Sequence, residues 1–103
     1  MRKFDIVRMQ AHEYDQRGKN VFCETPEFKL RVIDLAPRES LPQRKMASYV
    51  VFVCMEGEAE VGVGGEEMTV CRGQCLVTEP ATVAMSTQGG ARLLGIQIHG
   101  VGT

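Results

Sequence analysis

The sequence predicts an all-β domain, either a sandwich or a barrel, from three observations. Short strand-like segments recur roughly every eight to twelve residues, with glycine or proline turns between them. No window of about eleven or more residues shows the i, i+3, i+4, i+7 spacing of an amphipathic helix. The chain has 103 residues, which fits one domain with one hydrophobic core.

The first part of the chain contains one clear strand. Residues 1–20 are polar, and we expect a leading strand or arm followed by a loop. In Phe28–Leu35, apolar and charged residues alternate with the period of a half-buried strand. Pro37 is expected to end this strand, and Pro42 is expected to lie in the loop that follows.

The strongest strand signal is Tyr49–Met55, a continuous run of apolar, mostly β-branched and aromatic residues. Gly57 is expected to end it. Ala59–Val63 then alternates again, which predicts another strand. Gly64 and Gly65 supply the positive φ angles that a tight hairpin turn requires.

Four shorter segments complete the predicted strands. They are Met68–Arg72, Cys75–Thr78, Thr82–Ser86 and Arg92–His99, with turns at Gly73, Pro80 and Gly89–Gly90. Residues 101–103 are expected to form a loose tail.

Charge and hydropathy exclude several classes of function. The net charge of −1 provides no attractive field for nucleic acid or for an anionic membrane, so neither is expected as a partner. No apolar run approaches the roughly 18 residues of a membrane helix. The first residues lack the apolar core of a secretory signal, so we expect a cytoplasmic protein.

The four cysteines are expected to be reduced thiols, because disulfide frameworks belong to secreted proteins. They are Cys23, Cys54, Cys71 and Cys75. A structural zinc site is an alternative, because three residues separate Cys71 from Cys75 and zinc ligands are often spaced in this way. The simplest interpretation is that all four are small buried side chains.

Several segments together resemble the cupin family. Met55–Val61 (MEGEAEV) is similar to a strand–turn–strand segment of cupins, and Gly65–Gly73 is similar to the hairpin that follows it. Pro80–Val83 is similar to a later proline-containing turn. The resemblance implies one cupin-like domain over residues 1–103, a double-stranded β-helix or jelly-roll barrel. An arm and first strands would occupy residues 1–27, and the barrel core would occupy residues 28–99.

Cupins usually hold a divalent metal through three histidines and a glutamate. Aligning the family's motifs on Gly57 and Pro80 places other residue types at all four positions: Arg44, Met46, Val50 and Met85 (Ala84 when counted from Gly73). Arginine and valine cannot ligate a metal, so we expect no metal and no other cofactor. Copper held by the thioethers of Met46 and Met85 is an alternative, although two methionines filling a vacated cavity explain the pattern better.

If the family's ligand positions face inward, strand alternation predicts which residues line the barrel. The predicted ligand-binding residues are Arg44, Met46, Ser48, Val50, Phe52, Cys54, Cys75 and Met85. Tyr49, Val51, Val53 and Met55 then form an apolar outward stripe, which predicts a homodimer. Alternatively, a second sheet or the N-terminal arm covers the stripe.

The resulting functional hypothesis is a metal-free barrel that binds a small apolar or anionic ligand in a binding or regulatory role. Arg44 is the candidate anchor for an anion. The alternative is a cupin-type enzyme, an isomerase or dioxygenase, with an unrecognised site. Its candidate groups are Arg44, Cys54, Cys75 and His99, and His12 with Tyr14 and Asp15 is a separate acid–base candidate. A third possibility is a partner-binding role for the outward stripe.

Overall fold

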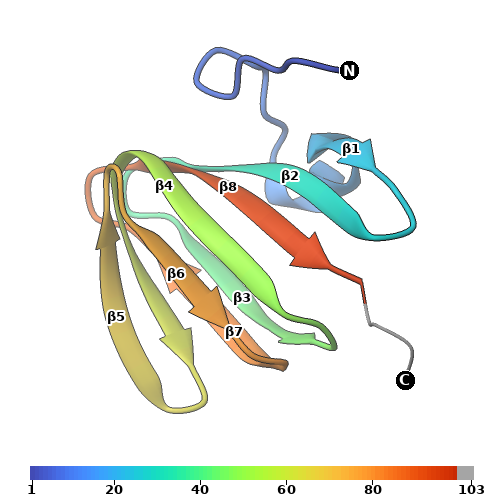
Figure 1. Cartoon of the computed structure of the whole chain (residues 1–103). Coiled ribbons are helices and arrows are strands. Elements are labelled where there is room, and N and C mark those ends of the chain that lie inside the picture. The colour runs from blue at the N-terminus through green and yellow to red at the C-terminus, as the bar shows by residue number, and fades with distance from the viewer. Residues whose placement is uncertain (100–103) are drawn as a thin grey trace.

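The computed structural model describes residues 1–99 and consists mainly of antiparallel strands (Figure 1). A short 3-10 helix, η1, precedes the strands. The elements are η1 (Tyr14–Asn20), β1 (Val21–Glu24), β2 (Phe28–Leu35), β3 (Ser40–Met46), β4 (Val50–Val63), β5 (Glu66–Cys71), β6 (Cys75–Thr78), β7 (Ala81–Ser86) and β8 (Ala91–Ile98). No helix within residues 1–99 is long and apolar enough to cross a membrane. The predicted tail, 101–103, lies outside the described residues.

The strands form one curled sheet with the order β1-β2-β8-β4-β7-β3, and β5 and β6 pair with β4. The 14-residue β4 joins the two layers. Its first half pairs with β8 and β6, and its second half pairs with β7 and β5. The sheet therefore folds over on itself into a barrel, as Figure 1 shows.

Gly57 does not end the long strand, contrary to the prediction. It lies at the bend of β4, with a φ angle of +72° that side chains rarely adopt. A Cβ atom there would also collide with the carbonyl oxygen of Gly90. The register of β4 against β8 shifts between Cys54 and Glu56, which marks a β-bulge beside the bend. The glycine is thus required for a turn within the strand.

Pro42 lies in β3 and not in a loop, which corrects a second prediction. β3 is the last strand in the sheet order and pairs only with β7. The pairing is irregular between Leu41 and Arg44. Proline has no N–H to donate, and an irregular edge strand tolerates that loss. By contrast, the turn at Gly64 and Gly65 is confirmed, with φ angles of +56° and +90°.

The hydrophobic core lies between the two layers. Val50, Phe52 and Cys54 are buried, whereas Val51, Val53 and Met55 are half-buried on the outer face, so the alternation predicted for this strand is confirmed. The other residues of this core cluster come from both layers, and they are Leu35, Ala59, Val61, Val70, Val83, Met85, Ala91 and Leu93. Tyr49 keeps 49% of its surface exposed. The homodimer expected from this outer stripe stays a prediction.

The face of β2 that carries Lys29 and Arg31 lines the barrel together with Ile33 and the core residue Leu35, a placement that its alternating pattern did not reveal. Arg31 lies opposite Gly95 of β8, which lies opposite the core residue Phe52 of β4. Directly opposed residues of antiparallel strands point to the same side of the sheet. Arg31 and its neighbour two positions away, Lys29, therefore point inward.

The face of β2 that carries Phe28, Leu30 and Val32 points outward, where the N-terminal segment covers part of the sheet. Arg92 lies on this outer face and donates hydrogen bonds from Nη1 to the carbonyl oxygens of Ile6 (3.0 Å), Val7 (3.1 Å) and Met9 (2.6 Å). Its Nε donates to Asp34 Oδ1 at 3.1 Å. One arginine thus anchors the segment 6–9 to the barrel.

Candidate functional site

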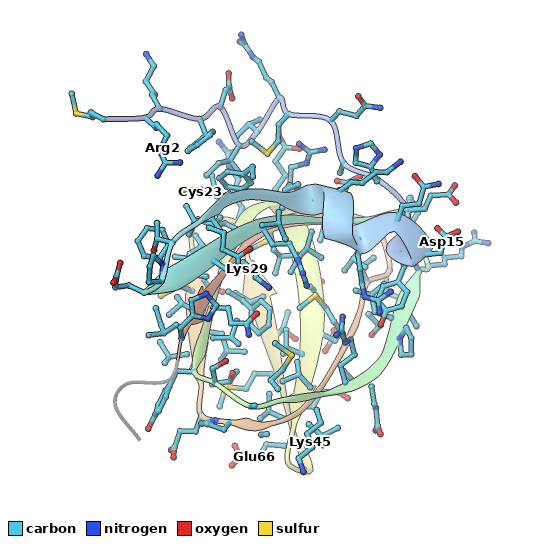
Figure 2. The ribbon with its side chains drawn as sticks, turned by 90° about the vertical axis from the view of Figure 1, so that its right-hand side faces the viewer. Arg2, Asp15, Cys23, Lys29, Lys45 and Glu66 are labelled. Atoms are coloured by element: carbon cyan, nitrogen blue, oxygen red, sulfur yellow. The ribbon has the colours of Figure 1, made fainter. Side chains whose placement is uncertain are left out.

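The barrel contains a cavity of about 110 Å³, lined by both layers and by the N-terminal segment. An apolar cavity of about 150 Å³ can hold a benzene ring, so this space suits the body of a small organic molecule. Figure 2 looks into the barrel: Lys29 extends from β2 towards the interior, and η1, marked by Asp15, lies between the β1–β2 edge and β3.

The cavity floor is apolar. Val50 and Phe52 reach it from β4, and Val83 and Met85 reach it from β7. Gly95 of β8 has no side chain to fill the space, and a Cβ atom there would lie 3.3 Å from Ile33 Cδ1. The floor therefore offers van der Waals contact and no polar partner to a bound ligand.

Arg31 is the unusual residue of this site. Its Nε is fully buried and has no hydrogen-bond partner. Burial lowers the pKa of the Arg31 guanidinium, and the positive charges of Arg44 and Arg17 lower it further. Tyr14 and the carboxylate of Glu24 oppose this lowering. An arginine remains charged in proteins, so the structure holds beside the apolar floor a buried guanidinium nitrogen that has no partner.

Two more arginines line the same cavity from other elements. Arg44 lies opposite the buried Val83 in the pairing of β3 with β7, and most of its own side chain is exposed. Arg17 comes from η1. Its Nη1 donates to the carbonyl oxygen of Tyr14 at 3.0 Å, and its guanidinium lies 4.3 Å from the centre of the Tyr14 ring. Three arginines from three different elements thus face one space, together with Lys29, which pairs with Glu24.

The neighbouring acidic groups are engaged elsewhere. Glu24 lies 3.7 Å from both Lys29 Nζ and His99 Nε2. Glu39, on the cavity wall, accepts a hydrogen bond from the Ala36 backbone at 2.9 Å. Within the part of the chain that the structure describes, no carboxylate forms an ion pair with any of the three cavity arginines.

The N-terminal segment supplies one wall of the cavity through His12 and Tyr14. The buried Asn20 holds this wall in place: its Oδ1 accepts from the His12 backbone N–H at 2.7 Å, and its Nδ2 donates to the His12 carbonyl at 3.0 Å. The sequence suggests His12 and Tyr14 only as acid–base candidates distant from the core strands. No local pattern signals that they reach the barrel.

Most of the predicted lining residues do border the cavity. They are Arg44, Met46, Val50, Phe52 and Met85. Ser48 does not border it, but its hydroxyl accepts a hydrogen bond at 3.1 Å from Nε2 of Gln97, which does. Missing from the sequence prediction were Arg31 and Arg17.

The cysteines lie outside the cavity. Cys54 is buried in the core, and its Sγ lies 3.4 Å from the carbonyl oxygens of both Glu56 and Gly57. Burial raises the pKa of the Cys54 thiol, which disfavours a thiolate nucleophile. Cys75 is exposed, so its predicted place in the barrel lining is wrong. It lies opposite the outward-facing Val53, and this register was not visible in the sequence.

The interpretation of all four cysteines as buried side chains holds for two of them. Cys23 and Cys54 are buried, whereas Cys71 is half-buried and Cys75 is exposed. Cys71 Sγ donates a hydrogen bond to Glu58 Oε2 at 3.5 Å, and this bond raises the pKa of the thiol.

The donor set of the barrel does not fit the metal that cupins usually hold. Arg44, Met46, Val50 and Met85 occupy the expected ligand positions, and they offer neither nitrogen nor oxygen ligands. Between residues 1 and 99, no three His, Cys, Asp or Glu side chains are grouped so that they could bind a metal ion.

Comparisons with known proteins find similarity of fold to solved structures. No family model and no curated protein matches the sequence. A cupin superfamily protein from Desulfitobacterium hafniense superposes with a TM-score of 0.70 at 14% identity, covering 76% of this chain and 72% of that one.

Two further structures give the same result. An RmlC-like cupin with a double-stranded β-helix fold, from Methanocaldococcus jannaschii, has a TM-score of 0.70 at 14% identity and covers 77% of this chain and 76% of its own. A cupin-2 domain protein from Shewanella frigidimarina has a TM-score of 0.65 at 15% identity, with coverage of 77% and 78%. The curled antiparallel sheet and these superpositions show that the chain has the cupin fold, a double-stranded β-helix.

Proposed function

We propose that this barrel binds a small organic anion, with the anionic group at the arginines and an apolar body on the floor formed by Val50, Phe52 and Met85. One observation carries the proposal: the buried Nε of Arg31 has no partner within the protein. A carboxylate or phosphate oxygen would supply that partner. Whereas the sequence suggests a ligand that is either apolar or anionic, the proposed ligand has both an apolar body and an anionic group.

The energetics support a ligand-binding role for Arg31. A buried donor without a partner costs about 1–3 kcal/mol, and more when it is charged. Natural proteins retain few such groups, and those that persist call for an explanation such as function. A guanidinium gains about 1.5–3 kcal/mol from a hydrogen bond to a charged acceptor, so an anion would reverse this cost.

The arrangement also favours an anion with an apolar body over a free inorganic ion. Val50, Phe52, Val83 and Met85 form a floor that inorganic phosphate could not use. Burying apolar ligand surface there contributes about 25 cal/mol per Å². The planar guanidinium of Arg31 matches a carboxylate through two parallel hydrogen bonds, which would fix the orientation of the ligand.

The test uses butyrate and its uncharged analogue butyramide as probes, in a zwitterionic buffer, with binding followed by NMR titration. We expect butyrate to bind at least about tenfold more tightly than butyramide, because one charge-assisted hydrogen bond contributes more than about 1.4 kcal/mol. Arg31→Met should remove this preference. Arg8→Met is the matched control, because Arg8 is exposed and pairs only with Asp5. Equal affinity of the wild type for both probes would refute the proposal.

A further inference from the structure

Arg17 differs from the other two cavity arginines because it does not come from a barrel strand. It lies on η1, within the segment that precedes the barrel, and nevertheless lines the cavity. The Tyr14 carbonyl accepts one hydrogen bond from its Nη1, and the Tyr14 ring packs against its guanidinium. A guanidinium has five N–H groups, so most of its donors remain available to a ligand.

The segment that carries Arg17 is held in a defined place. Asn20, with 6% of its surface exposed, closes two hydrogen bonds with the backbone of His12. Nearer the start of the chain, Arg92 donates hydrogen bonds to the carbonyl oxygens of Ile6, Val7 and Met9. The contacts of Asn20 and Arg92 therefore hold the segment that carries Arg17 in place by interactions within the protein.

The third cation changes the charge balance of the site. All three arginines line one cavity, and Arg44 and Arg17 each act on Arg31 as repelling positive charges, so both lie within electrostatic reach of Arg31. Two other charged groups of the lining are already paired, Lys29 with Glu24 and Asp34 with Arg92. The three arginines and the carboxylate of Glu39 then leave an excess of two positive charges, and a ligand with a single negative charge would offset only one of them. In an environment of lower dielectric than water, the remaining repulsion is only weakly screened.

Given the anion-binding function proposed above, on which this inference rests, we propose that Arg17 makes the site select ligands with two negative charges at one end. Two carboxylates on one carbon, or a phosphate monoester, share this chemistry. Arg31 and Arg44 engage the first charge, and Arg17 engages the second from η1. Arg17 is thus a specificity residue contributed by the N-terminal segment.

A matched pair of probes isolates the second charge. Butyrate and ethylmalonate share the same apolar body and differ by one carboxylate on the same carbon. Propyl phosphate carries the alternative dianionic group, and its second ionisation near pH 6 gives an internal check. We expect ethylmalonate to bind the wild type at least tenfold more tightly than butyrate at pH 8. Propyl phosphate should bind more tightly at pH 8 than at pH 5.

Substitution of Arg17 then assigns the selectivity. In Arg17→Gln, the affinity ratio of ethylmalonate to butyrate should fall towards one, because ethylmalonate should lose more affinity than butyrate does. Arg17→Lys keeps the charge and should retain most of the ratio, which separates a charge effect from loss of the segment's structure. Arg8→Gln serves as the control, because Arg8 lies on the same N-terminal segment, is exposed and lies outside the cavity.

The outcomes separate this inference from the function on which it rests. An unchanged ratio in Arg17→Gln, or an equal loss of both ligands, would overturn the role of Arg17 while leaving anion binding intact. A preference for ethylmalonate without propyl phosphate binding would assign the site to dicarboxylates, and the reverse would assign it to phosphate monoesters. If the wild type binds none of the three anions, both proposals fall.

Discussion

Replacing Arg31 with methionine should stabilise the ligand-free protein, although it should abolish anion binding. The substitution keeps an unbranched side chain of similar reach and removes the guanidinium. The buried Nε then no longer lacks a partner, and the repulsion from Arg44 and Arg17 disappears. Residues that a protein retains at the cost of stability are characteristic of binding sites.

The expected gain follows from the burial of a single donor. An unpaired buried polar group costs about 1–3 kcal/mol, and we take the lower limit because Arg31 as a whole is only half-buried. A gain of about 1 kcal/mol raises the Tm of a domain of this size by about 4–8 °C. The thioether would also contact the apolar floor, which acts in the same direction.

Thermal unfolding followed by circular dichroism measures this difference. The buffer must be zwitterionic, because a bound buffer anion would stabilise the wild type and mask the effect. Arg8→Met provides the surface control, with an expected change within about 0.5 kcal/mol, as is usual for exposed positions. A Tm for Arg31→Met that lies several degrees below the wild type would show that Arg31 stabilises the fold, and would refute the reasoning.

Three further predictions concern the fold and its thiols. Gly57→Ala should destabilise the protein by more than about 2 kcal/mol in urea unfolding, because strain at positive φ adds to a collision of the new Cβ atom with Gly90. Gly64→Ala, at a site with open space, should destabilise it by only about 1–2 kcal/mol, from the strain alone. Equal losses of stability in the two variants would contradict the bend at Gly57. Leu93→Ala should lose about 2–5 kcal/mol, because Leu93 is fully buried, and a loss below 1 kcal/mol would argue against this core. Glu58→Gln should lower the pKa of Cys71 and speed its alkylation by iodoacetamide at pH 8, resolved by peptide mass spectrometry; unchanged or slower alkylation would count against the hydrogen bond.

The fold could be predicted from the sequence because its signals are local. The turn at Gly64 and Gly65 requires positive φ angles, and the sequence places two glycines there. The strands Phe28–Leu35 and Cys75–Thr78 have the predicted bounds. The signals that set these bounds, apolar–polar alternation and the proline that follows each strand, lie within or next to the segment itself. The sequence predicts a strand end at Gly57 where the structure has a bend, because glycine is typical of both strand ends and bends within strands.

The site was harder to predict because pairing between distant strands creates it. Alternation in β2 shows that Arg31 and Leu30 face opposite sides, but it does not say which side becomes the barrel interior. Only the register against Gly95 and Phe52 decides that Arg31 points inward. The same limitation misplaced Cys75, whose side follows from its pairing with Val53. Arg44 was found because the cupin resemblance located it.

The strand order has a consequence for the synthesis of this protein. All four partners of β4 (β5, β6, β7 and β8) follow it in the chain, and β2 and β3 also wait for β8 and β7. At about 5–20 residues per second, the ribosome takes roughly 2–7 s to go from the end of β4 to the end of β8. Until β8 is made, the apolar run Tyr49–Met55 lacks the partner of one of its edges, so a nascent chain would present an aggregation-prone strand edge to chaperones.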